Sequence, residues 1–408
     1  MKLIKSNGIT NNSYDELETL SLINYNVSYY NKEKRLTPII KWPGGKDSEL
    51  NYILPQLPKQ IENFYDPFVG GGAVYFAVKA KNYFINDKSD ELINLYLELA
   101  KKNNELFFNL FIKIIENWKA LEEIVRNNNN FFIQLYRSYH IEKNLIKLKD
   151  KITQFILEHN FEFKDLLKGS FFNMNIENFL FELNKNLTSK INNLSKIEDD
   201  GNDVIDFDLL QNIETALKSA FYMHFRHLYN NSNFYQLNRT VQTVIFYFIR
   251  NQAYSGMFRY NSKGEFNVPY GGIQYNRKDF NKKLNYFRQK DFLNHLSKTK
   301  ITSLDFEDFI LKFKPSNNDF VFLDPPYDSE FSTYTKNVFG KEEHIRLANL
   351  FIKNCKAKWM LVIKNTEFIV SLYEGKGLHI TSFDKRYLVS FKNRNNPNTK
   401  HLIIKNYD

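Results

Sequence analysis

The octapeptide FVFLDPPY at residues 320–327 decides the fold that we expect of this chain. Its first four residues are apolar and strand-forming, so Asp324 stands at the carboxyl end of a buried strand. Ligands of open α/β sheets bind outside such strand ends. The two prolines remove two backbone donors, which leaves a carboxylate, prolyl carbonyls and the ring of Tyr327.

These groups suit a planar ligand that carries an NH2 group, such as an adenine base. The carboxylate and a carbonyl accept its two protons, and the tyrosine ring stacks on it. A loop with a capping aspartate and two turn prolines is the alternative that this stretch alone leaves open.

The composition indicates a globular protein with a polyanionic partner. The chain has 408 residues, of which 43% are hydrophobic, enough for one large domain or two ordinary ones. Its net charge of +10 favours nucleic acid over a membrane surface as partner, against the alternative of a generally basic soluble protein. The single cysteine, Cys355, excludes a disulfide framework and a cysteine-rich zinc site and fits the cytoplasm. We expect no metal site, signal peptide or membrane span.

Two glycine turns in the first hundred residues suit a ligand that comes close to the backbone. The first, IIKWPGGK at residues 39–46, presents Trp42 and Lys46. It fails as a phosphate loop because the upstream glycine is missing and Asp47 replaces Ser or Thr. It suits an aromatic ligand with a carboxylate, or else it is an ordinary turn with a packed tryptophan. The second, FYDPFVGGG at residues 64–72, predicts a strand and a glycine loop, followed by a helix at 73–78.

The strand YFIND at residues 83–87 ends in an acid. Asp87 can accept hydrogen bonds from ribose hydroxyls, as the acid after the second strand of such a unit does. It can also cap the helix expected at residues 91–99, and the two roles can coexist. The spacing of the glycines disfavours a nicotinamide dinucleotide, so we expect another adenosine-bearing ligand.

Helical periodicity dominates residues 100–240, which predicts a largely helical insertion. A further helix at 241–251 leads into a β-hairpin that turns at residues 261–264. Arginines, amides and aromatic residues alternate in this hairpin. They suit phosphate contacts, base-edge hydrogen bonds and wedging into a base stack. A solvated hairpin with scattered charge is the alternative.

Helices and strands alternate in the last third of the chain, which predicts an α/β sheet. We expect a helix at 280–296, a strand at 300–306 with Asp305 near its end, the strand before Asp324, a helix at 342–353 and a strand at 359–363. Asp305 is a second candidate for contact with an adenine amine or a ribose. A basic loop follows at residues 385–394.

Together the stretches KWPGGK (41–46), DPFVGGG (66–72) and DPPY (324–327) and the hairpin at 250–271 resemble the Dam-like family of DNA adenine-N6 methyltransferases, in its alpha order of motifs. The resemblance covers residues 36–99 and 241 to the end, whereas the insertion is longer than in compact members. It implies a Rossmann-like sheet with helices on both faces, S-adenosylmethionine as cofactor, and methylation of a flipped adenine in duplex DNA. We expect an N-terminal extension (1–35), a catalytic domain (36–99 and 273–408) and an insertion with the recognition region (100–272, hairpin 254–272).

The resemblance also implies roles for single residues. The catalytic residues would be Asp324, Pro325, Pro326 and Tyr327. The cofactor would be bound by Trp42, Lys46, Asp66, Phe68, Gly70, Gly72, Asp87, Asp305, Phe306 and Asp324. Tyr254 and Ser255 would wedge into the duplex, with Ser255 in place of the usual Asn. The remaining DNA contacts would come from Lys41, Arg250, Met257, Arg259, Asn261, Pro269, Arg386, Lys392 and Arg394.

This resemblance predicts a monomeric, cytoplasmic enzyme, with a restriction endonuclease as a candidate genetic partner. An RNA or protein N-methyltransferase is one alternative, although such sites more often carry Asn at the position of Asp324. A non-catalytic DNA-binding specificity subunit that retained the fold is another.

Overall fold

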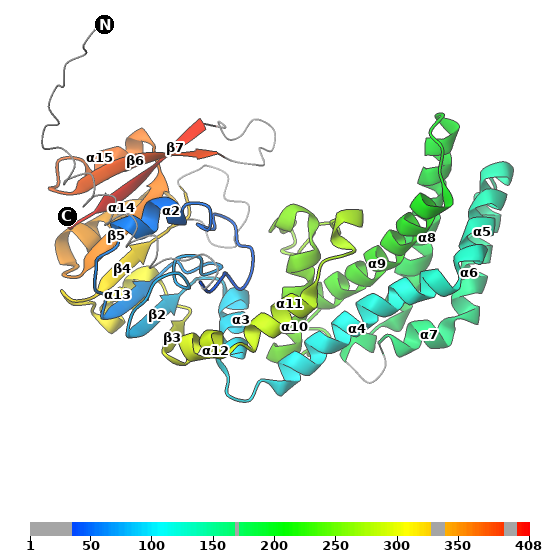
Figure 1. The fold of residues 1–408 in the computed structure, drawn as a ribbon, viewed down its shortest axis with the longest axis horizontal. Coiled ribbons are helices and arrows are strands. Elements are labelled where there is room, and N and C mark those ends of the chain that lie inside the picture. Colours follow the sequence, from blue (N-terminus) through cyan, green and yellow to red (C-terminus); the bar gives the residue numbers. More distant parts are fainter. Residues whose placement is uncertain (1–34, 168–170, 328–338, 387–397) are drawn as a thin grey trace, which may run out of the picture.

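The computed structural model describes residues 35–167, 171–327, 339–386 and 398–408. They form a sheet flanked by helices and an elongated helical insertion that projects from one side of it (Figure 1). Among these residues, no helix combines the length and apolar character needed to cross a membrane.

One seven-stranded sheet organises the first of these parts, with the strand order β3-β2-β1-β4-β5-β7-β6. The five strands from β3 to β5 run parallel, and β7 lies antiparallel between β5 and β6. The strands are β1 (Asn63–Asp66), β2 (Asn82–Asn86), β3 (Thr299–Thr302), β4 (Phe320–Leu323), β5 (Lys358–Lys364), β6 (His379–Arg386) and β7 (Asn398–Lys405). The strand order reverses between β1 and β4, which is where such sheets bind ligands.

Helices cover both faces of the sheet, so the expected α/β fold is confirmed. All four residues of β4 are buried, with Phe320 and Phe322 in one core and Val321 and Leu323 in the other. This explains why the strand is continuously apolar. The helices of this part are α2 (Leu50–Ile53), η2 (Leu54–Gln56), α3 (Asp90–Ala100), α11 (Phe280–Phe287), α12 (Lys290–Ser297), α13 (Phe306–Phe313), α14 (Lys341–Asn349), η6 (Leu350–Asn354) and α15 (Glu367–Tyr373).

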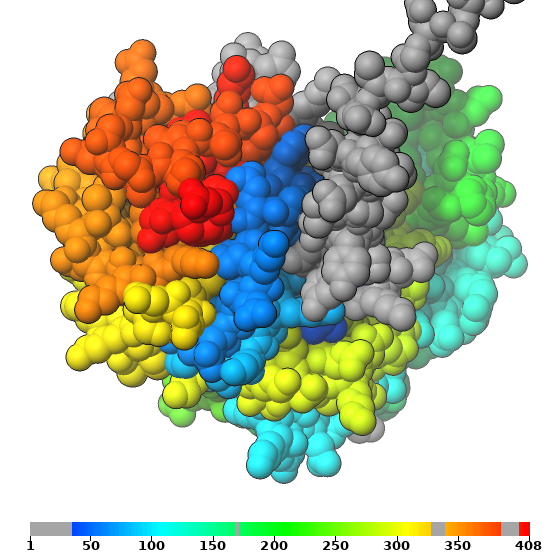
Figure 2. Space-filling model, turned by 60° about the vertical axis from the view of Figure 1, so that its left-hand side comes forward, coloured from blue at the N-terminus to red at the C-terminus, as the bar shows by residue number. Residues whose placement is uncertain are grey.

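The N-terminal part of the described chain joins elements that are distant in sequence. In Figure 2 it forms a blue band between the C-terminal elements, orange to red, and the yellow-green elements. The Tyr407 hydroxyl donates to the carbonyl of Gln56 at 2.9 Å, and the Tyr286 hydroxyl on α11 donates to the carbonyl of Thr37 at 2.6 Å. The segment that carries the first glycine turn is therefore held from both sides.

Three local predictions were wrong. The helix expected at 73–78 is a run of turns, since all six side chains are buried and packing sets the backbone path. The helix expected at 280–296 is broken between α11 and α12; the break lets Phe287 and Phe292, five residues apart, both enter the core, with ring centroids 5.4 Å apart. The strand expected at 300–306 stops at Thr302, because Asp305 caps α13.

The insertion is largely helical in its described residues, as predicted. Its elements are α4 (Glu105–Asn127), α5 (Asn129–Glu142), α6 (Leu145–Glu158), α7 (Asn160–Asp165), η3 (Phe171–Asn173), α8 (Ile176–Asp199), α9 (Asp206–Asn230) and α10 (Arg239–Gln252). In Figure 1 the helices α5 to α8 lie farthest from the sheet, whereas α10 lies close to α3.

The hairpin expected after α10 is present, with η4 (Tyr254–Gly256) near its start and η5 (Ile273–Tyr275) after its end. Antiparallel bridges join Ala253 to Tyr270 and Tyr260 to Phe266. The Gly264 amide donates to the Asn261 carbonyl at 2.9 Å, which closes the turn at the expected residues. We call residues 253–270 the recognition hairpin.

Candidate active site

Lys46 meets the DPPY motif at the carboxyl end of β4. The lysine side chain is only 2% exposed, and its Nζ forms an ion pair with Asp324 Oδ1. The same Nζ donates to the Gly44 carbonyl at 2.9 Å and to the Tyr327 hydroxyl at 3.2 Å. The cation of the first glycine turn therefore orients both the acid and the aromatic residue of a motif that follows 278 residues later.

Tyr327 has a second neighbour that the sequence did not indicate. The ring of His401, on β7, lies edge-on to the tyrosine ring, with centroids 5.4 Å apart and an interplanar angle of 89°. His401 is fully buried. Only the insertion of β7 beside β5 brings this C-terminal residue to the motif.

The second glycine loop lies beside the same motif because β1 and β4 are neighbours in the sheet. The Gly70 amide donates to Asp87 Oδ2 at 3.0 Å, and the Tyr96 hydroxyl donates to the Gly70 carbonyl at 3.0 Å. A Cβ atom on Gly71 would lie 2.4 Å from the Ile40 carbonyl oxygen, and one on Gly70 would lie 3.0 Å from the ring of Trp42. The two glycine turns are thus packed directly on each other, and side chains on the loop have no room.

In the part of the chain that the structure describes, the carboxylates of Asp66, Asp87 and Asp324 share this region with the ammonium group of Lys46. Burial raises the pKa of Asp66 well above its ordinary value, and the nearby charge of Asp324 raises it further. Burial also raises the pKa of Asp87, to about 6, although amides of Ser89 and Gly70 donate to its carboxylate. Among the described residues, Lys46 is the buried lysine of this region, and it is paired with Asp324. A cationic ligand would favour the ionised forms of Asp66 and Asp87, so the region suits such a ligand.

Aromatic rings form a wall beside the second loop. Phe68 lies 5.7 Å from Phe306 and 5.6 Å from Phe339, and the last two are 5.8 Å apart, measured between ring centroids. Phe68 and Phe306 were expected at the ligand, whereas Phe339 was missed because no motif surrounds it. Three rings at these distances suit the edges and faces of a heteroaromatic base.

Asp305 lies next to this wall, but its carboxylate already has two protein partners. Oδ1 accepts a hydrogen bond from the Glu307 amide at 3.0 Å, and Oδ2 forms an ion pair with Arg346 at 2.7 Å. The guanidinium of Arg346 also lies 4.4 Å from the ring centroid of Phe306. Arg346 was not expected from the sequence; it has no motif, and only the packing of α14 on α13 brings it here.

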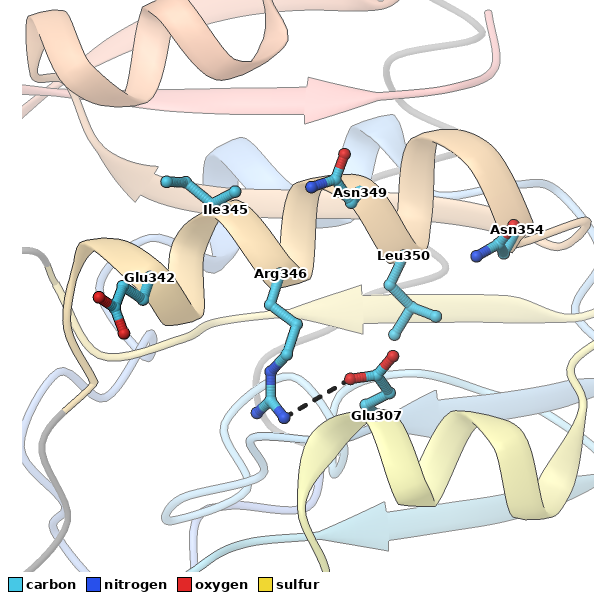
Figure 3. A pocket seen from close by; sticks show the side chains of 7 residues that line it. All are labelled: Glu307, Glu342, Ile345, Arg346, Asn349, Leu350 and Asn354. Atoms are coloured by element: carbon cyan, nitrogen blue, oxygen red, sulfur yellow. Dashed lines mark ion pairs between the residues drawn. The ribbon is translucent and has the colours of Figure 1, made fainter.

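Arg346 also lines a groove of about 390 Å³ between α13 and α14. Figure 3 shows its side chain pointing from α14 toward Glu307 on α13, with which it forms an ion pair at 3.5 Å. None of the residues lining the groove belongs to the glycine turns or to the DPPY motif. We therefore place the reacting groups at the strand ends and not in this groove.

The residues that we expected to contact DNA lie in the recognition hairpin and beside it. They fall into an exposed or partly exposed group and a buried one. Lys41, Tyr254, Arg259 and Pro269 are exposed, and Ser255, Met257 and Asn261 are partly exposed. Arg250 is different: it is 3% exposed, and its guanidinium donates to the carbonyls of Gly256, Met257 and Lys41. Arg250 is thus withdrawn from the surface on which we expected a DNA contact.

Ser255 adopts a left-handed backbone conformation, with φ of 53°. Asn tolerates this region better than Ser does, so the departure from the usual Asn has a conformational cost. On the C-terminal side, the side chain of Arg386 and all of Lys392 and Arg394 lie outside the described residues, and their expected DNA contacts stay predictions.

Comparison with known proteins gives one consistent result. The chain matches the family model described as D12 class N6 adenine-specific DNA methyltransferase over residues 42–216 and 175–387. It is 28% identical over 377 residues to the Type II methyltransferase M.CviBI of Paramecium bursaria Chlorella virus NC1A, covering 91% of this chain and 100% of that protein. It is 26% identical over 388 residues to the Type II methyltransferase M.MjaIII of Methanocaldococcus jannaschii, covering 91% and 99%. It is 24% identical over 352 residues to M1.LlaDCHI of Lactococcus lactis subsp. cremoris, covering 84% and 87%.

Proposed function

Because this chain belongs to the D12 class N6 adenine-specific DNA methyltransferase family, we propose that it transfers the methyl group of S-adenosylmethionine to N6 of an adenine flipped out of duplex DNA. The predicted Dam-like resemblance, Rossmann-like fold and adenine-specific DNA methyltransferase activity are confirmed by this membership. The alternatives of an RNA or protein methyltransferase and of a non-catalytic subunit lose their support.

The residues at the strand ends fit S-adenosylmethionine. When bound, this cofactor supplies an activated methyl group on a sulfonium. The excess of carboxylates around Lys46 suits its positive charge, and Asp87 would accept hydrogen bonds from its ribose hydroxyls. Phe68, Phe306 and Phe339 would contact its adenine ring. The crowded glycines, which leave no room for side chains, let the backbone approach a ligand closely.

Trp42 and Lys46 would line the same cofactor site from the first glycine turn, with Asp66, Gly70 and Gly72 beneath it. Asp305 is held by Arg346 and by the α13 amide, so we propose that it shapes the wall at Phe306.

The observation that carries the proposal is the contact of Lys46 with both Asp324 and Tyr327. The N6 nitrogen of adenine is a poor nucleophile because its lone pair is delocalised into the ring. Asp324 and the Pro325 carbonyl would accept its two protons and favour a pyramidal nitrogen, which returns electron density to the lone pair. The fixed carboxylate also stabilises the positive charge that develops on nitrogen. Lys46 orients this carboxylate and so contributes positioning.

Tyr327 would stack on the flipped base and offset part of the cost of unstacking it. Lys46 and His401 contact its ring and hydroxyl from two sides, so the ring is preorganised for this task. Pro326 keeps the turn stiff and free of a backbone donor.

DNA would lie against the recognition hairpin and the neighbouring first glycine turn. Tyr254 is 49% exposed, which suits a wedge, and the exposed Arg259 and Pro269 suit contact with bases. Lys41 would contact a flanking base. Asn261 accepts from the amides of Lys263 and Glu265, so it also holds the hairpin turn.

We further propose a division into a catalytic domain (36–99 and 273–408) and an insertion with the recognition region (100–272). Since the named relatives are Type II methyltransferases, we propose that the enzyme acts as a cytoplasmic monomer that protects DNA from a cognate restriction endonuclease.

The test is methyl transfer by an Asp324→Asn variant, measured as tritium incorporation from labelled S-adenosylmethionine into duplex DNA, with N6-methyladenine identified by mass spectrometry. We expect a loss of at least about a hundredfold in rate, because the fixed negative charge is removed, while cofactor binding weakens less. Glu62→Gln is the matched control; it breaks an exposed ion pair with Lys81 at 3.0 Å. Full activity in Asp324→Asn, or loss in both variants, would contradict the assignment.

A further inference from the structure

We propose that Arg250 is a positioning residue that couples DNA binding at the recognition hairpin to cofactor binding at the two glycine turns. This inference rests on the proposed function, since it needs both ligands.

Arg250 stands in the last turn of α10 and lies between the two regions. Its guanidinium donates to Gly256 O at 3.2 Å and to Met257 O, both at the start of the hairpin. It also donates to Lys41 O at 3.3 Å, in the first glycine turn. This side chain thus joins the start of the hairpin to a backbone carbonyl that lies 209 residues before Arg250 in sequence.

Two aromatic rings, one from each region, enclose the guanidinium. Its Cζ lies 4.5 Å from the ring centroid of Phe258 on the hairpin and 5.4 Å from that of Trp42 on the glycine turn. The two rings are 5.2 Å apart. Any change in the path of the hairpin between Gly256 and Phe258 must therefore move either the guanidinium or its contacts with Trp42.

The connection continues from Trp42 to the second glycine loop. A Cβ atom at Gly70 would lie 3.0 Å from Trp42 Cδ1, and the Ile39 amide donates to the Gly71 carbonyl at 3.1 Å. The hairpin also touches this turn directly, since a Cβ atom at Gly256 would lie 3.3 Å from Lys41 Cδ. A continuous set of tight contacts thus joins the hairpin to the loop that we expect under the cofactor.

The environment of Arg250 suits a coupling residue better than a purely structural one. Burial lowers its pKa to about 10, and its Nε has no hydrogen-bond partner among the described residues. A buried cation that is held by carbonyls depends on their position, because losing one of them leaves a donor unsatisfied. The left-handed Ser255 lies directly before Gly256, so the segment that DNA would contact has a conformational cost that binding can change.

The experiment measures this coupling as the ratio of two affinities. The dissociation constant of S-adenosylhomocysteine, a product that allows no turnover, is determined by calorimetry with and without a saturating duplex that contains the methylated site. In the wild-type enzyme we expect the duplex to tighten binding by about fivefold or more. By linkage, S-adenosylhomocysteine must tighten binding of the duplex by the same factor, measured by fluorescence anisotropy.

Arg250→Met removes the hydrogen bonds and keeps much of the volume. We expect this variant to bind each ligand alone but to show a coupling ratio within twofold of one. Arg250→Lys keeps the charge but should show less than half of the wild-type coupling ratio. If Arg250→Met does not fold, Arg250→Lys serves as the test of the coupling role. Arg288→Met is the control: its guanidinium stacks on Phe108 at 4.8 Å, away from both regions, and its ratio should equal that of the wild type.

The outcomes separate this inference from the proposed function. If the wild type binds neither ligand, the proposed function fails. If it binds both but with a ratio of one, or if the Arg250 variants keep the wild-type ratio, the coupling role is refuted while the proposed function stands.

Discussion

Replacement of Asp87 by Asn should remove most of the pH dependence of cofactor binding. Burial raises the pKa of Asp87 to about 6, whereas a bound ribose and a nearby sulfonium both favour the ionised carboxylate. Below about pH 6 the free enzyme must therefore lose a proton from Asp87 in order to bind. If binding lowers the pKa of Asp87 from about 6 to below about 4, the affinity for the cofactor should weaken roughly tenfold as the pH falls from 7 to 5.

The same shift predicts the pH dependence of stability without ligand. Because the folded pKa lies above the unfolded one, the folded state binds more protons between about pH 4 and pH 6. Stability should therefore fall as the pH rises through this window, by about 2–3 kcal/mol. The loss should be absent in Asp87→Asn.

Calorimetric titration with S-adenosylhomocysteine from pH 5 to pH 7 checks the first part, and urea unfolding of the free protein checks the second. This product lacks the sulfonium, so its pH dependence reports the ribose contacts, and S-adenosylmethionine should show a steeper one. Asp66, whose pKa is also raised, is present in both proteins, so the difference between them isolates Asp87. Asn cannot accept from both the Gly70 and Ser89 amides, hence it should bind more weakly at pH 7. Parallel pH profiles for the two proteins would refute the role of Asp87.

Two further substitutions test the glycine loop and the recognition hairpin. Gly71→Ala should weaken cofactor binding by about tenfold or more, because its Cβ would lie 2.4 Å from Ile40 O. Gly340→Ala is the control: no atom lies within 4 Å of its Cβ, so this variant should bind the cofactor as the wild type does. Calorimetry measures both affinities. Arg259→Ala should relax sequence choice, seen by sequencing methylated DNA from a host that expresses the variant, whereas loss of Lys392 or Arg394 should weaken binding to all sequences alike. If Arg259→Ala methylated the same DNA sites as the wild type, the role of Arg259 in sequence choice would be contradicted.

The position of the site followed from the sequence because strand ends obey a simple rule. Parallel strands that are neighbours bring their carboxyl ends to one edge, so Asp66 and Asp324 had to lie near each other once β1 and β4 were recognised. The contact of Lys46 with Asp324 was not predicted, because Lys46 follows a turn and not a strand of the sheet. Side-chain partners were less accessible to prediction. Arg250 and Arg259 belong to one motif and look alike in sequence, yet one is buried under carbonyls and the other is exposed.

Residues that packing alone brings to the site could not be found in this way. His401 reaches Tyr327 only because β7 pairs with β5, and Arg346 reaches Asp305 only because α14 packs on α13. Neither residue stands in a motif. Asp305 shows the reverse case: its residue type suited a ligand, but a helix cap and an ion pair occupy its carboxylate.

One face of α9, in the long insertion, contacts the recognition hairpin and the residues that follow it. Four side chains spaced by four residues, and therefore aligned along one side of the helix, reach the backbone of residues 266–276. Lys218 donates to Asn276 O at 2.9 Å, Tyr222 and Arg226 donate to Val268 O at 2.8 and 3.1 Å, and Asn230 exchanges two hydrogen bonds with Phe266. The contacts with Val268 and Phe266 involve backbone atoms of the hairpin, so they set its path independently of the side chains that would read DNA. Substitutions on this face of α9 would thus act on recognition through the shape of the hairpin, whereas substitutions at its exposed side chains would act directly.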